Sequence, residues 1–171
     1  MLNSDSLISI LKEKKYDFEI YRHQALHTVE DSNKFRGEIK GSHSKNLFLK
    51  NKKNNFYLVS CEEHNQLNLK RISKSLNLGN ISFAKEEYLN KYLCIKPGSV
   101  SPFALLNDVD NNVFFYLEKN LYESELINFH PLINTLTITM FTKDFIEFII
   151  ENNKKIHIFS SDEGVILKTY G

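Results

Sequence analysis

The feature that most constrains the fold is a pair of short apolar runs separated by a polar turn. The runs KNLFLKN and NFYLVSC occupy residues 45–51 and 55–61, and the polar residues KKNN join their apolar parts. Two runs of strand length on either side of such a turn predict a β-hairpin. We therefore expect a fold built around a sheet that contains this hairpin.

Helical and strand-like patterns alternate along the rest of the chain. Helices are expected at residues 4–17, 28–35, 66–78, 85–93 and 142–153. Thr28 and Thr142 are the expected N-caps of two of them. Further strands are expected at residues 18–23, 81–84, 103–108, 113–119 and 135–141, with a strand or hairpin after residue 153. Because strands and helices do not follow a strict βα order, we expect a mixed sheet rather than a doubly wound one.

The composition is that of an ordinary globular domain. The 171 residues are 42% hydrophobic and 25% charged, which predicts one domain over residues 1–171. The net charge of +1 excludes a protein that is basic over its whole surface, so contact with a nucleic acid requires a local patch. Cys61 and Cys94 lack metal or redox spacing, and the sequence contains no signal peptide or membrane span. These features predict free thiols in the cytoplasm.

Three loop-like stretches carry candidate functional residues. Lys45 and Asn46 stand at the start of the first hairpin strand. Gly98 and Pro102 mark a Gly-x-x-x-Pro loop, in which the glycine lets a ligand approach the main chain. His130 precedes a proline, which restrains the histidine to extended geometry. Each has a simpler alternative, namely a solvated lysine, an ordinary loop and a structural histidine.

The sequence predicts no metal centre. His23 and His27 are four residues apart, but on a strand-and-loop stretch without a third ligand. The run CEEHN at residues 61–65 contains ligand types, yet adjacent residues rarely converge on one ion, and we interpret it as a polar loop. No P-loop, dinucleotide fingerprint or triad spacing is present.

The stretches TVED, SHSKNLFLKNKK, PGSVSPFALLND, NFHPLINTLTIT and DFIEFI, in this order, resemble the prolyl-tRNA editing family, the YbaK-like aminoacyl-tRNA deacylases. The resemblance covers about residues 21–150 and is greatest to free-standing members that hydrolyse alanine mischarged on tRNA(Pro). It implies an α/β fold with a mixed, curved, partly barrel-like sheet, surrounding helices and a pocket for the 3′ end of aminoacyl-tRNA. Residues 154–171 form a C-terminal extension that the resemblance does not explain.

The resemblance also implies the site residues, with no cofactor, no metal and no covalent nucleophile. The positions that match the family's catalytic segments are Lys45, Asn46, Gly98, Ser101, Pro102 and His130. Many relatives have glycine where this chain has Ala104. The positions expected to line the amino-acid pocket are Ile20, Thr28 and Phe129, and ordinary core packing is the alternative for Ile20 and Phe129. The residues expected to contact tRNA are Lys34, Arg36, Lys40, Lys50, Lys52 and Lys53, with a solvated lysine-rich surface as the alternative.

The resemblance implies a trans-editing hydrolase that deacylates Ala-tRNA(Pro) during translation by positioning water on the aminoacyl ester. Its expected partners are the acceptor end of aminoacyl-tRNA and prolyl-tRNA synthetase, with no membrane. One alternative is a deacylase for another mischarged residue, such as cysteine or serine. A second alternative is a tRNA- or synthetase-binding module without catalysis, against which the intact set of Lys45, Gly98 and His130 argues.

Overall fold

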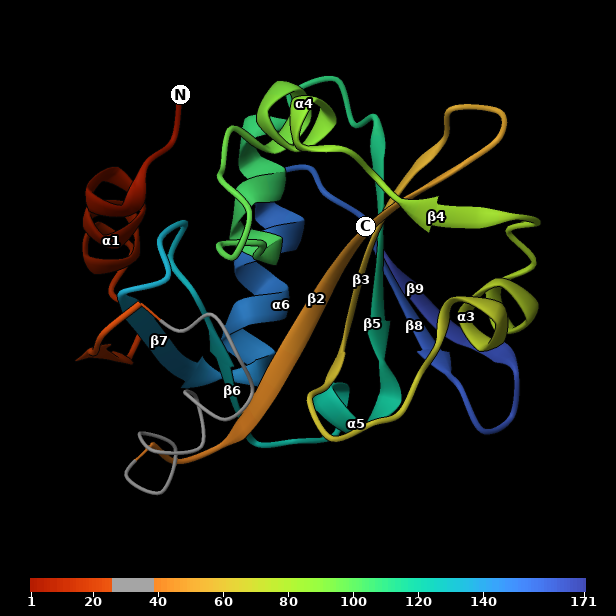
Figure 1. Ribbon diagram of the computed structural model, residues 1–171. Coiled ribbons are helices and arrows are strands. Elements are labelled where there is room, and N and C mark those ends of the chain that lie inside the picture. Colours follow the sequence, from red (N-terminus) through yellow and green to blue (C-terminus); the bar gives the residue numbers. More distant parts are fainter. Residues whose placement is uncertain (26–38) are drawn as a thin grey trace.

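The computed structural model describes residues 1–25 and 39–171, which form an open mixed sheet with helices packed on it (Figure 1). The strands follow the order β1-β7-β6-β2-β3-β5-β8-β9, and β4 pairs with β2. Their bounds are β1 Phe18–Arg22, β2 Ser42–Asn51, β3 Phe56–Glu62, β4 Ile81–Phe83, β5 Val113–Glu118, β6 Leu126–Phe129, β7 Leu136–Phe141, β8 Ile156–Ser160 and β9 Val165–Tyr170. The mixed sheet is confirmed, but β1 and β9 stand at opposite ends of it and the sheet does not close into a barrel.

Helices cover both faces of the sheet. Their bounds are α1 Ser4–Glu13, α3 Leu69–Leu76, α4 Glu86–Tyr88, a π-helix Leu89–Leu93, a 3₁₀ helix Pro102–Asn107, α5 Lys119–Tyr122 and α6 Thr142–Glu151. The larger core contains Leu7 of α1 and Phe145 of α6, whereas the smaller core contains Ile72 and Leu76 of α3. In Figure 1, β2, β3 and β5 accordingly lie between α6 and α3.

The predicted hairpin is formed by β2 and β3, which pair antiparallel. Successive side chains of a strand point to opposite faces, and this alternation assigns each residue of β2 to one of the two cores. Leu49 and Tyr57, which pair directly, belong to the core beneath α3. Phe48 and Leu58, the next pair, belong to the core shared with α1 and α6. β2 therefore separates the two cores.

The C-terminal residues are an integral part of the sheet. β8 pairs parallel with β5, and β9 returns antiparallel along β8, which confirms the hairpin expected in the tail. The helix expected at residues 85–93 is also present, as α4 followed directly by the π-helix. The helix expected at residues 28–35 lies outside the described residues.

The structure contradicts two local expectations. Residues 103–108 are not a strand, because Ser101 accepts a hydrogen bond from the Phe103 amide and Pro102 occupies the first turn of a 3₁₀ helix. Thr142 is not the cap of α6, since the N-cap position is Phe141 and the Thr142 hydroxyl donates instead to the Ser124 carbonyl. None of the helices in residues 1–25 and 39–171 is long and apolar enough to cross a membrane.

Candidate active site at the open edge of β2

The candidate site lies where two parts of the sheet separate along β2. One edge of β2 pairs with β3 over residues 44–50. The other edge pairs with β6 at Ser42 and His43 and then with β4 from Leu49 to Asn51. Among the described strands, none pairs with residues 44–47 on this second edge. We call this gap the open edge of β2; a ligand at such a gap can reach backbone groups as well as side chains.

Lys45 and Asn46 both lie in the open edge, but their side chains point to opposite faces of the sheet. The Lys45 Nζ donates to the Asn65 carbonyl at 2.5 Å, on the face of the smaller core. On the opposite face, the Asn46 Oδ1 accepts from the Ser60 hydroxyl at 2.5 Å and its Nδ2 donates to the Ser44 Oγ at 3.2 Å. Strand alternation explains this separation of neighbours, and both side chains are half-buried.

Asn128 connects the open edge to β6, and its only sequence signal is that it is a polar residue in an apolar run. The Ser44 hydroxyl donates to the Asn128 carbonyl at 3.0 Å. The Asn128 amide nitrogen donates to the carbonyls of Lys40 and Ser42, at 2.9 and 3.2 Å, and its oxygen accepts from Thr139. This buried network fixes the start of β2 against β6, two residues before His130.

His130 lies beside His23, which the sequence analysis considered together with His27. The ring centroids of His130 and His23 are 5.9 Å apart. The His130 Nδ1 donates to the Leu136 carbonyl at 2.8 Å, which makes Nδ1 the protonated nitrogen of the neutral ring. The His23 Nδ1 donates to the Gln24 carbonyl at 2.8 Å, and its Nε2 lies 2.8 Å from the Thr137 hydroxyl. Only the pairing of β1 with β7 brings these residues together, so sequence spacing does not reveal it.

The loop of residues 96–102 packs against the loop that follows His130. The Ser99 amide donates to the Lys96 carbonyl at 3.1 Å, with Pro97 in between and Gly98 at φ +86°, the arrangement of a type II turn. A Cβ on Gly98 would lie 3.4 Å from the Asn134 Nδ2. Glycine is therefore required by the turn itself, and the turn brings Gly98 next to the segment of His130.

Ser101 and Pro102 lie beneath this loop rather than on its surface. Both are buried, and Ser101 is 0% exposed, with its hydroxyl capping the 3₁₀ helix. Their position supports an indirect contribution through the loop. A direct contact of either residue with a substrate stays a prediction.

Phe129 and Ile20, the expected pocket residues that the structure describes, face the larger core. Phe129 is 3% exposed, and its ring lies 4.8 Å from that of Phe145 and 6.1 Å from that of Phe103, measured between centroids. Ile20 is half-buried and pairs with Ile138 of β7 on the same side. This placement favours core packing for both residues, and their role in selecting the amino acid stays a prediction. Thr28 lies outside the described residues.

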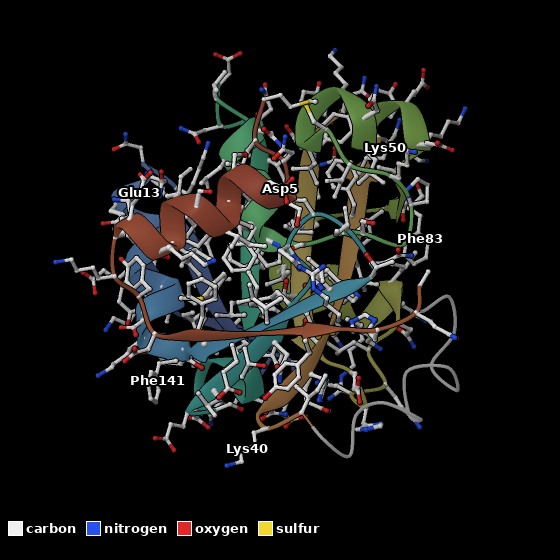
Figure 2. The ribbon with its side chains drawn as sticks, turned by 90° about the vertical axis from the view of Figure 1, so that its left-hand side faces the viewer. Asp5, Glu13, Lys40, Lys50, Phe83 and Phe141 are labelled. Carbon is white, nitrogen blue, oxygen red and sulfur yellow. The ribbon has the colours of Figure 1, made fainter. Side chains whose placement is uncertain are left out.

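The four expected tRNA-binding residues within the described part of the chain do not form one cluster. Lys40 precedes β2, whereas Lys50 is near its end and Lys52 and Lys53 are in the β2–β3 turn. Figure 2 shows Lys40 and Lys50 on opposite sides of the molecule. Lys34 and Arg36 lie outside the described residues. Of the four described residues of this set, Lys40 therefore lies on one side of the open edge, and Lys50, Lys52 and Lys53 lie beyond its far end.

Two other features of the described residues contribute little to this site. Glu62, Glu63 and His64, at the end of β3 where Glu62 pairs with Ser44, bring potential ligand atoms within 4.8 Å of one another, and we assign no ion to them. A groove of about 800 Å³ runs along α6 between residues such as Phe141, Ile150 and Tyr170, and none of the candidate site residues lines it.

Lys45 lies next to Cys61, whose thiol is neutral. Cys61 pairs with Lys45 across the hairpin. Burial raises the pKa of the Cys61 thiol to about 12, and the Lys45 charge only partly opposes this shift. The thiol is therefore protonated at neutral pH and cannot act as a thiolate nucleophile.

Comparison of the sequence with known proteins identifies the family. The model of the aminoacyl-tRNA editing domain family matches residues 23–148. The "Prolyl-tRNA editing protein ProX" of Acetoanaerobium sticklandii is 32% identical over 149 residues, 86% of this chain and 90% of that protein. The "Prolyl-tRNA synthetase associated domain-containing protein 1" of Mus musculus is 35% identical over 136 residues, 77% of this chain and 80% of that protein.

A solved structure supports the same fold. A crystal structure described as that of a candidate trans-editing enzyme for prolyl-tRNA synthetase superposes with a TM-score of 0.66 at 14% sequence identity. The superposition covers 91% of this chain and 95% of the other. From the family match and these relatives, the chain belongs to the aminoacyl-tRNA editing domain family.

Proposed function

We propose that this chain is a prolyl-tRNA editing hydrolase that removes alanine from mischarged tRNA(Pro). The observation that carries the proposal is the open edge of β2. There Asn46 is linked through Ser44 and Asn128 to the strand that leads into His130, and Lys45 lies beside it on the opposite face, in a chain of the aminoacyl-tRNA editing family. A relative with 32% identity is named a prolyl-tRNA editing protein, which supports tRNA(Pro) as the carrier.

The substrate is an ester, so the protein needs to align a water molecule rather than create a strong nucleophile. Alignment of reacting groups is worth roughly 7–11 kcal/mol at its limit. Backbone groups of the open edge and of residues 98–102 are the proposed alignment surface, because Gly98 leaves the main chain accessible in its turn. The tRNA's own ribose hydroxyl is the proposed proton relay, consistent with a site in which Cys61 remains a neutral thiol.

The side chains around the open edge have distinct proposed roles. Lys45 holds the terminal phosphate or ribose and stabilises the oxyanion as it forms; one such donor is typically worth about 10²–10³-fold in rate. Asn46 orients the adenosine from the other face of the sheet. His130, held by its bond to the Leu136 carbonyl, forms a hydrogen-bonding wall at the amino-acid end rather than a general base.

Selectivity follows from the limits of a single binding pocket. A synthetase pocket that accepts proline cannot strongly exclude the smaller alanine, since a missing methylene is worth only about 1–3 kcal/mol. A second site that admits alanine and excludes proline removes this error. The same reasoning allows serine or cysteine as the preferred residue, because both are also smaller than proline.

The test is a panel of aminoacylated tRNA(Pro) substrates that carry alanine, serine, cysteine or proline. The proposal predicts that the purified protein releases alanine fastest and leaves proline attached. Faster release of serine or cysteine would assign the alternative substrate. If the folded protein hydrolyses none of these substrates, its assignment as a hydrolase is refuted.

A further inference from the structure

A basic and aromatic surface begins where the open edge of β2 ends. β4 pairs with residues 49–51 of β2, and the Ala84 amide donates to the Phe48 carbonyl at 3.0 Å. Ala84 packs on the larger core, as do Tyr88 and Tyr92, whereas Phe83, which pairs with Leu49, points to the other face of β4. β4 therefore exposes Phe83 on one of its faces and leads into Lys85 and α4 on the other. Lys50 is five residues beyond Lys45, about 16 Å along the strand at about 3.3 Å per residue.

Two lysines on this surface are positioned over tyrosine rings. The Lys50 Nζ lies 5.2 Å from the centre of the Tyr88 ring, and the Lys91 Nζ lies 5.1 Å from that of Tyr92. Both tyrosines pack against Phe56, with centroid distances of 4.9 and 4.7 Å. The rings are thus fixed by the core, and each holds an ammonium group in place at its face.

The β2–β3 turn presents two more lysines in a defined geometry. The Asn51 side-chain oxygen accepts from the amides of Lys53 and Asn55, at 3.0 and 2.9 Å. The Lys50 Nζ also donates to the Asn54 side chain at 3.3 Å. These bonds order the turn, and Lys52 and Lys53 are exposed on it. An ordered turn loses less conformational freedom when a ligand binds.

Phe83 is the exposed aromatic residue of this surface. Its side chain is 61% exposed on the short strand β4, which pairs with β2 in the described structure (Figure 2). The charges nearby are mostly positive: five lysines, at positions 50, 52, 53, 85 and 91, stand against the carboxylates of Glu86 and Glu87. An exposed aromatic ring can stack on an unpaired base, and an excess of cations attracts phosphates. Such a surface is suited to a polyanion with accessible bases.

We propose that this surface, formed by the β2–β3 turn, β4, α4 and the π-helix, binds the unpaired nucleotides that precede the terminal adenosine of tRNA and the adjoining acceptor-stem phosphates. The inference rests on the proposed function, because it places the rest of the tRNA beside the site that takes its aminoacyl end. Phe83 stacks on an unpaired base, and the lysines contact phosphates. Phe83 thus contributes to recognition of the single strand, whereas the lysines bind any sequence.

The test is binding of an uncharged RNA hairpin that mimics the acceptor stem, with and without its CCA overhang. Binding of uncharged RNA needs no hydrolysis, so its outcome is distinguishable from failure of the proposed function. Phe83→Ala is expected to weaken binding of the overhang hairpin by at least fivefold and to bind the blunt hairpin like the wild type. Phe83→Tyr, which keeps a stacking ring, is expected to bind both RNAs like the wild type. The matched control is Phe141→Ala, since Phe141 is partly exposed at the end of β7, on the opposite side of the molecule from Phe83 (Figure 2).

The lysines are tested by the salt dependence of binding. Replacing Lys52 and Lys53 with alanine together is expected to reduce the slope of log K against log salt by about 1.4–1.8, the value for two phosphate contacts. The control is the double variant of Lys12 and Lys155, which are exposed on α1 and before β8. Thermal unfolding checks that each variant is folded. The inference is overturned if the folded Phe83→Ala and double-lysine variants bind both hairpins with wild-type affinity and salt slope, or if the controls weaken binding equally.

Discussion

Replacing Phe129 with alanine distinguishes a core residue from one that selects the amino acid. The ring is 3% exposed and packs against Phe145 and Phe103, so its removal leaves a cavity that these neighbours fill only in part. Such a change costs about 3–5 kcal/mol. A domain of ordinary stability has about 5–15 kcal/mol in total, so the loss is a large fraction of it. The melting temperature is expected to fall by about 6–20 °C.

The assay combines unfolding with hydrolysis of alanyl-, seryl- and prolyl-tRNA(Pro). We expect Phe129→Ala to be strongly destabilised while its order of preference among the three substrates is unchanged. Phe83→Ala removes the same atoms from a side chain that is 61% exposed, and its unfolding free energy is expected to change by at most about 0.5 kcal/mol. A Phe129→Ala protein of nearly wild-type stability that hydrolyses prolyl-tRNA would refute the core assignment and support the residue as a wall of the pocket.

Three further predictions follow from the same structure. Activity is expected to survive chelator treatment; its loss, followed by recovery on addition of zinc, would show a metal centre. Ser101→Ala is expected to lower the unfolding free energy by about 0.5–2 kcal/mol through loss of the cap, measured by urea unfolding; an unchanged unfolding free energy would contradict the capping role. Burial raises the pKa of Cys61 from 9.0 to about 12, so its contribution to stability is complete below pH 9 and is lost as the pH rises toward 12. Above pH 9, the unfolding free energy of the wild type should therefore fall with pH more steeply than that of Cys61→Ala, by about 1.4 kcal/mol per pH unit. Equal slopes for the two proteins would contradict the raised pKa of Cys61.

Local patterns were enough to predict the hairpin of β2 and β3, α1, α6 and the mixed character of the sheet. In each case the apolar spacing or the turn residues act over a few neighbouring positions. The same reasoning failed at residues 103–108, whose apolar run resembles a strand. There Ser101 and Pro102, just before the run, start a 3₁₀ helix instead.

The geometry of the site depends on pairings between distant segments, which the spacing of residues does not contain. The open edge exists because β6 and β4, which are far apart in sequence, pair with the two ends of one edge of β2. The contact of His23 with His130 likewise requires β1 to lie beside β7. Sequence resemblance pointed to Lys45, Gly98 and His130 as candidate site residues, whereas only the fold shows that Lys45 and Asn46 face opposite sides of the sheet.

The most direct test of the central claim is the single-turnover rate of Ala-tRNA(Pro) hydrolysis by wild-type protein and by Lys45→Ala. Lys45 carries the cation of the open edge, so the account predicts a loss of at least about tenfold in the variant. The control Lys155→Ala removes an exposed lysine before β8 and should retain the wild-type rate. Thermal unfolding of Lys45→Ala establishes that losing its bond to the Asn65 carbonyl leaves the protein folded. A folded Lys45→Ala protein that deacylates Ala-tRNA(Pro) at nearly the wild-type rate would contradict the account.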